Sequence, residues 1–186
     1  MGCDIHQFYT IKNNETGKTE FHEFVYVPFF KTDDEQTQFY KKMYNSTNTE
    51  LALPEPFSGR FYDFFGIIGG VRSNYLNISS DDKQVGWPND EIPETLDTSY
   101  LHSFCWYKLN DLTNYLDKTI DKIKRYQKAM VAKDPSYIFD GEDDEEFMIK
   151  TLEIYLNKLK TSTEYIKDNF KQYDVNSMKL LFAFDS

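Results

Sequence analysis

Cysteine is scarce in this sequence, and long apolar runs are missing from it. The two cysteines, Cys3 and Cys105, permit one disulfide and exclude a dense disulfide framework. No stretch approaches the roughly 20 consecutive apolar residues of a membrane-spanning helix. The N-terminus also lacks the basic region and apolar run of a secretory signal. We therefore expect a protein of the reducing cytoplasm, with its cysteines as thiols and no membrane partner.

Basic residues are outnumbered by acidic ones, 21 to 31, which gives a net charge of −10. Direct nucleic-acid binding is not expected, because neutralising phosphates requires a basic face. The charge is compatible instead with a basic protein partner or a cation. Hydrophobic residues make up 40% of the chain and aromatic residues 17%, so a sizeable core is available. The length of 186 residues suits a single domain, 1–186.

The common motifs for metal and phosphate binding are also missing. The chain has no H-x-E-x-H, C-x-x-C or H-E-x-x-H spacing. The glycines at 66, 69 and 70 do not form a phosphate-binding loop, because the characteristic lysine and the strand–loop–helix order are absent. A site is therefore expected only where the fold gathers residues from distant segments.

The hydrophobic pattern predicts an α+β fold. Aromatic and β-branched residues predict a β-hairpin from 3–12 and 21–30, and an extended segment at 100–109. An apolar run predicts a last strand, 179–184, that returns beside the first. These segments are expected to form a small, mostly antiparallel sheet.

Helices are expected to pack against this sheet. Their predicted ranges are 36–44, 60–72, 110–132 and 145–173. The third and fourth are long and amphipathic and are joined by a polar connector, so they predict an antiparallel helical hairpin over 110–173. The predicted helix 60–72 is short, and each of its three glycines weakens it by nearly 1 kcal/mol relative to alanine. Close packing or a nearby ligand would explain that weakness.

Asp4 and His6 are the first candidate site. They stand two residues apart on the first predicted strand, so their side chains point to the same face. A carboxylate beside an imidazole can bind a divalent metal ion, move a proton or hold a polar ligand. His102 could join them if the strands meet, and three such groups would suit one metal ion. The alternative is that His6 only hydrogen-bonds to a neighbour within the sheet.

Three further candidates are less specific. Ser103 follows His102 directly, but adjacent side chains on a strand point apart, so the pair is not expected to be a catalytic dyad. Arg72 could meet a phosphate or carboxylate, or simply complement the dipole at a helix end. Cys3 could be a nucleophile paired with a histidine, but it does not become the N-terminal residue when Met1 is removed.

Four blocks, spread from one end of the chain to the other, share a pattern with a known family. They are M-G-C-D-I-H at 1–6, G-R-F-Y-D-F-F-G-I-I-G-G-V-R at 59–72, H-S-F-C-W-Y-K-L-N-D-L at 102–112 and F-A-F-D at 182–185. In these blocks the chain resembles a family of uncharacterised phage and prophage proteins. It departs from the family at Phe61, where asparagine is usual, and at Cys105, where serine is usual.

The resemblance implies that the polar residues of these blocks belong to one pocket. They are Asp4, His6, Tyr62, Asp63, Arg72, His102, Ser103 and Asp185. In this pocket Asp4, His6 and His102 would act as acid and base or hold one divalent metal ion. The ligand-binding residues would be Tyr62, Asp63, Arg72, Ser103 and Asp185. The long loop 73–98 would close the pocket.

We expect a phage accessory protein, of the counter-defence type, in the cytoplasm of the host cell. It would bind or hydrolyse a small phosphate-bearing, nucleotide-like ligand. Two alternatives remain open: an acidic, non-enzymatic protein that inhibits a host defence factor by protein–protein contact, and a structural or morphogenesis protein of the phage. Convergence of Asp4, His6 and His102 within about 4–6 Å would favour the ligand-binding function, because charges couple over that range.

Overall fold

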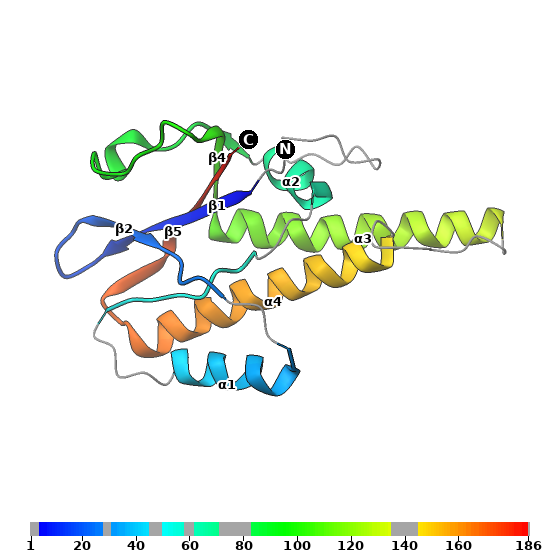
Figure 1. The fold of residues 1–186 in the computed structure, drawn as a ribbon, viewed down its shortest axis with the longest axis horizontal. Helices are drawn as coiled ribbons and strands as arrows, with labels where there is room; N and C mark the ends of the chain where they lie inside the picture. Colours follow the sequence, from blue (N-terminus) through cyan, green and yellow to red (C-terminus); the bar gives the residue numbers. More distant parts are fainter. Residues whose placement is uncertain are drawn as a thin grey trace.

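The computed structural model describes residues 4–27, 31–44, 50–57, 62–70, 83–134 and 145–185. It has the expected α+β architecture, a five-stranded antiparallel sheet with helices packed on it (Figure 1). None of the described helices is long and apolar enough to cross a membrane.

The last strand of the chain lies at the centre of the sheet. β5 (Tyr173–Phe184) pairs antiparallel with β1 (Ile5–Asn13) on one side and with β4 (His102–Lys108) on the other. β2 (Thr19–Glu23) and β3 (Gln84–Val85) form the edges, which gives the order β2-β1-β5-β4-β3. The predicted hairpin and the predicted return of the last strand to the first are therefore confirmed.

The hairpin of β1 and β2 is shorter than predicted. Gly17 lies in its turn with φ +70°, a left-handed conformation that glycine adopts without steric cost. Beyond β2 the chain makes an isolated parallel bridge between Val25 and Pro54, which takes the place of the rest of the predicted strand 21–30. Residues 28–30 lie outside the described part of the chain.

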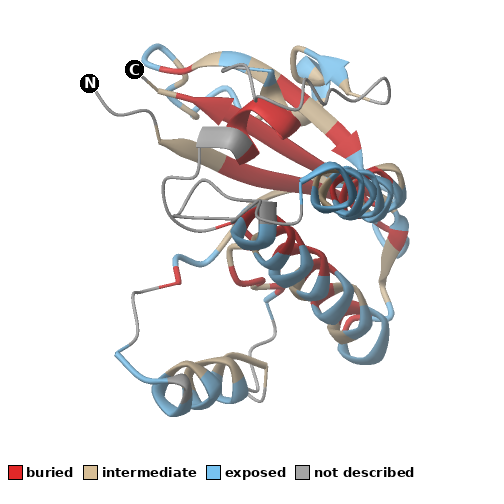
Figure 2. Ribbon diagram, turned by 90° about the vertical axis from the view of Figure 1, so that its right-hand side faces the viewer, coloured by how far each residue is buried: buried red, intermediate tan, exposed pale blue. Residues whose placement is uncertain are grey.

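One face of the sheet packs on the helices. α3 (Leu109–Lys133) and α4 (Glu145–Asn169) form the predicted antiparallel hairpin, with the short α2 (Tyr62–Gly69) near them (Figure 1). Alternate strand residues belong to one buried core with these helices. These residues are Tyr9, Ile11, Cys105, Tyr107, Leu180, Phe182 and Phe184. Figure 2 shows the middle of the sheet as buried. α1 (Asp33–Tyr44), which includes the predicted helix 36–44, lies against the outer side of α4.

The C-terminal end of α2 is buried, and side chains supply hydrogen bonds to its last carbonyl groups. The pairs are Tyr115 Oη to Ile67 O (3.0 Å), Tyr107 Oη to Ile68 O (2.7 Å) and Lys83 Nζ to Gly69 O (3.0 Å). The lysine also complements the negative end of the helix dipole. Gly70 follows with φ +68°, the conformation in which glycine commonly ends a helix. These bonds explain how a short, glycine-containing helix keeps its place.

Trp87 anchors the segment between β3 and β4 to the opposite face of the sheet. Its indole N–H donates to Phe182 O (3.0 Å) and to Cys105 O (3.2 Å), and its ring contacts Phe8 and Phe104 edge-on. This part of the predicted loop 73–98 therefore lies fixed on the sheet. Residues 73–82 lie outside the described part of the chain.

Glu91 makes a second anchor for the same segment. It ends the 3₁₀ helix η1 (Asn89–Glu91), accepts a hydrogen bond from Thr10 Oγ1 (2.7 Å) and forms an ion pair with Lys179. Thr10 belongs to β1 and Lys179 to β5, so one carboxylate joins the segment to two strands. The route of the chain into β4 is fixed by these contacts.

Replacing Trp87 by phenylalanine tests the first anchor. The change removes the indole donor from two partly buried carbonyl groups, so we expect the free energy of unfolding to fall by about 1–3 kcal/mol. Trp106→Phe is the matched control, because the chain has two tryptophans and Trp106 is only partly buried, with Lys179 Nζ 5.0 Å from its ring centroid. Urea denaturation measures both. Equal losses in the two variants would contradict the anchoring role.

Candidate functional site

The start of β1, the start of β4 and the end of β5 meet at one end of the sheet, in the middle of its width (Figure 1). His6 pairs with Ala183 across β1 and β5, and His102 pairs with Phe184 across β4 and β5. This end of the sheet brings together five of the eight residues that were expected to form a pocket. We call them the junction site: Asp4, His6, His102, Ser103 and Asp185.

Asp185 ties the two ends of the described chain together. Its Oδ1 accepts a hydrogen bond from the backbone N–H of Asp4 (2.6 Å), and its own N–H donates to the Asp4 carbonyl oxygen (3.2 Å). Its Oδ2 lies 3.2 Å from His6 Nε2. The carboxylate therefore fixes both the backbone at the start of β1 and the ring of His6.

His102 is held by the same residue through the backbone. Its Nε2 lies 3.2 Å from the carbonyl oxygen of Asp185, and its Nδ1 lies 2.9 Å from Ser103 Oγ. A carbonyl oxygen can only accept a hydrogen bond, so Nε2 must carry the hydrogen. In the neutral ring Nδ1 is then the acceptor, and the Ser103 hydroxyl donates to it. This orientation allows an imidazole to take the proton of a serine.

The expectation that His102 and Ser103 point apart is wrong, and the backbone gives the reason. Ser103 has φ +54°, in the left-handed region that few residues other than glycine adopt. His102 and Cys105 are three residues apart on β4, but their partners on β5, Phe184 and Phe182, are only two residues apart. This mismatch is the pattern of a β-bulge, which interrupts the alternation of side chains. The conformation costs about 1–2 kcal/mol, and such strain is concentrated at functional sites.

The junction site is open to water. Ser103 is exposed, and the other four residues are partly buried. Tyr100, just before β4, places its ring edge-on to His6, with centroids 5.7 Å apart. The Tyr100 side chain is 54% exposed, so it forms a rim on which a planar ligand could stack. No motif in the sequence pointed to Tyr100, because only the path of the segment into β4 brings it to His6.

The arrangement of Asp4, His6 and His102 does not support the metal site predicted from them. In the described part of the chain, no group of three or more His, Cys, Asp and Glu side chains is placed to hold a metal ion. The hydrogen bonds give the reason, since both ring nitrogens of His102 have other partners and His6 Nε2 is directed at Asp185. The arrangement is compatible with the other two expected functions of these side chains, proton transfer and the binding of a polar ligand.

Three predicted ligand-binding residues cannot be located at the site. Tyr62 and Asp63 begin α2, but their side chains lie outside the described part of the chain, as does all of Arg72. The rest of α2 packs into the core at the same end of the sheet, where the ring of Phe65 lies 5.5 Å from that of Phe184, the residue before Asp185.

Cys105 is a buried free thiol. Burial raises its pKa to about 12, an effect that the charge of Lys83 only partly offsets. A thiol with so high a pKa is inert as a nucleophile at neutral pH. The other cysteine, Cys3, lies outside the described residues.

A cavity of about 470 Å³ opens beside β4, lined mainly by the segment that Trp87 anchors. Its walls include Phe104, which directly follows Ser103, and Thr98, two residues before Tyr100. A cavity of this size can hold a small ligand. All of its lining residues except Phe104 belong to the segment 86–98, which is part of the loop 73–98 that was expected to close the pocket, but no motif there indicated a cavity.

Comparisons of the chain with protein-family models, with curated proteins and with solved structures found no match.

Replacing Ser103 by glycine tests the strain in the backbone. Glycine adopts φ +54° without steric cost, whereas alanine keeps that cost, and both substitutions remove the hydroxyl. We expect the free energy of unfolding of the Ser103→Gly variant to be about 1 kcal/mol higher than that of the Ser103→Ala variant. Chemical denaturation of the two variants gives the difference. An alanine variant as stable as the glycine variant would show that the folded protein does not hold this residue at positive φ.

Proposed function

We propose that the junction site is the active site of a hydrolase that acts on a small phosphate-bearing, nucleotide-like ligand. The observation that carries the proposal is the 2.9 Å contact between His102 Nδ1 and Ser103 Oγ, on a serine that is exposed and has a positive φ. The other ring nitrogen is fixed by a carbonyl oxygen, so the imidazole is oriented to act as a general base.

In the proposed reaction Ser103 is the nucleophile and His102 is the general base. Ser103 Oγ attacks the phosphorus of a phosphodiester, and its proton passes to His102 Nδ1. The bond from phosphorus to the leaving oxygen breaks, and that oxygen takes the proton from His102. Water then attacks the phosphoserine and gives a proton to His102, which returns it to Ser103 Oγ as the serine leaves. Asp185 acts as a positioning residue, because it holds the rings of His102 and His6.

The substrate class rests on the sequence and on the rim of the site. Arg72 is the cation proposed to meet the phosphate, because a guanidinium matches the geometry of phosphate oxygens. The exposed ring of Tyr100 would stack on a planar base, and the cavity beside β4 would take the rest of the ligand. A phage accessory role in the host cytoplasm is part of the same proposal and comes from the resemblance alone.

Release of p-nitrophenolate from bis(p-nitrophenyl) phosphate tests the hydrolase. We expect turnover by the unmodified chain. Ser103→Ala and His102→Ala should each lower kcat/KM by at least about 100-fold, because a positioned general base contributes about 10²–10⁴-fold to a rate. Ser99→Ala is the matched control, since it removes an exposed serine hydroxyl four residues earlier and should leave the rate unchanged.

Circular dichroism of each variant separates loss of chemistry from loss of fold. Full activity in both Ser103→Ala and His102→Ala would rule out the proposed roles. No turnover of this phosphodiester by the unmodified chain would rule out the reaction. The acidic inhibitor and the structural phage protein would then be the functions to test, by capture of a host protein and by presence in purified particles.

A further inference from the structure

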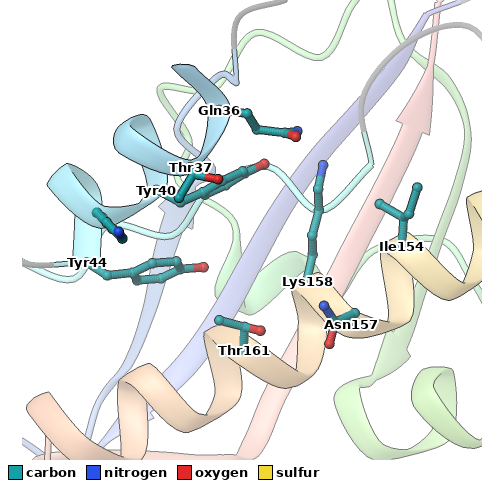
Figure 3. Close-up of a pocket in the computed structure, with 9 residues that line it drawn as sticks. Gln36, Thr37, Tyr40, Tyr44, Ile154, Asn157, Lys158 and Thr161 are labelled. Atoms are coloured by element: carbon teal, nitrogen blue, oxygen red, sulfur yellow. The ribbon is translucent and has the colours of Figure 1, made fainter. Parts of the chain in front are cut away.

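A second cavity, of about 520 Å³, lies between α1 and α4 (Figure 3). None of the junction-site residues lines it, and the proposed hydrolase does not use it. Its volume lies in the range of pockets that bind small molecules. Three properties of its walls indicate the chemistry of a ligand.

The first property is positive charge in a strongly acidic chain. Lys41 and Lys158 line the cavity, and none of its lining residues is an aspartate or glutamate, although the net charge of the chain is −10. Desolvation lowers the pKa of Lys158, and the nearby carboxylate of Glu55 offsets this only in part. Glu55 is itself engaged, because it accepts a hydrogen bond from Gln7 Nε2 (3.0 Å). A partly desolvated ammonium of this kind favours an anion beside it.

The second property is a hydroxyl group that lacks a partner. Tyr40 Oη is buried and has no hydrogen-bond partner in the described structure. Burial, with smaller contributions from Tyr44 and Glu55, raises the pKa of Tyr40 to about 12, so the hydroxyl keeps its proton and remains a donor. Figure 3 shows this hydroxyl and the amine of Lys158 directed toward the same space between the helices. A ligand oxygen there would receive hydrogen bonds from both.

The third property is an aromatic and apolar wall. Tyr40 and Tyr44 stack along α1, with ring centroids 6.3 Å apart and planes at 19°. Ile154 lines the α4 side, and 46% of it is exposed. Rings and an isoleucine in these positions suit a flat apolar group.

We propose that this cavity binds a small molecule in which a planar ring carries one anionic group, a phosphate or a carboxylate. The anionic group lies against Lys158 and Tyr40, with Lys41 as a second cation. The ring lies between the tyrosines of α1 and Ile154 of α4. This site is separate from the proposed hydrolase and does not depend on it.

Such a ligand also fixes the position of α1. α1 also meets α4 through Tyr44, a residue of the cavity wall, whose ring packs on Tyr165 (4.7 Å between centroids) and whose Oη lies 3.4 Å from Ser162 Oγ. None of residues 34–44 is fully buried, so this interface is small. A molecule that contacts both helices adds contacts to the interface between α1 and α4. Tryptic cleavage at Lys41, which lies on α1, should therefore slow when the cavity is filled.

Calorimetric titration with three probes that share a naphthalene ring tests the proposal. Naphthyl phosphate, naphthoate and the uncharged naphthol are titrated into the Ser103→Ala chain, so that the junction site cannot turn over the phosphate. We expect at least one of the two anions to bind about tenfold or more tightly than naphthol, the factor typical of a hydrogen bond to a charged group. The anion that binds identifies the group, and the same anion should slow cleavage at Lys41.

Matched variants locate the binding. Lys158→Met keeps most of the apolar stem and removes the charge, so it should weaken the anion about tenfold, to the level of naphthol. Tyr40→Phe keeps the ring and should weaken the anion several-fold. Lys150→Met, at an exposed position of the same helix, should change nothing.

Three results would overturn the inference: equal binding of anions and naphthol, equal weakening by Lys150→Met and Lys158→Met, or no binding of any probe. The hydrolase proposal is tested at His102 and Ser103, so the failure of one proposal can be told from the failure of the other.

Discussion

The junction site is held together by the contacts that Asp185 makes with Asp4, His6 and His102. The carboxylate of Asp185 accepts hydrogen bonds from Asp4 and His6, and the carbonyl oxygen of the same residue accepts one from His102. These partners lie 181, 179 and 83 residues away in sequence. Contacts so distant form only when β5 has entered the sheet between β1 and β4. The junction site therefore exists only in the complete fold.

The energetic cost of this arrangement falls on Ser103. β4 has one more residue than β5 at the bulge, and the serine takes a positive φ there. In the same region His102 reaches both Ser103 and Asp185, and the indole of Trp87 reaches carbonyl groups of both strands. The pairing of β4 with β5 and the anchor at Trp87 hold a conformation that an isolated strand would not keep. Ser103 has a strained backbone, is exposed and contacts His102, and this combination favours a functional role over a purely structural one.

The fold could be predicted from the sequence because each element has its own local pattern. Apolar residues such as Leu112 and Leu116 follow the helical period, and the last strand is almost wholly apolar. The grouping of polar residues at strand ends could also be anticipated. The orientation of Ser103 could not, since it follows from a register mismatch between strands that are distant in sequence. The cavity between α1 and α4 likewise depends on how two separate helices dock.

Determining the tautomer of His102 tests most directly the central claim, that His102 Nδ1 accepts a hydrogen bond from Ser103. Nitrogen NMR spectroscopy of labelled imidazole rings reports which ring nitrogen carries the hydrogen. The structure predicts a neutral ring with its hydrogen on Nε2, bound to the Asp185 carbonyl oxygen, and a bare Nδ1 that accepts from Ser103. The Nδ1 signal should therefore shift when Ser103 is replaced by alanine. A hydrogen on Nδ1, or an Nδ1 signal that does not respond to this replacement, would contradict the account.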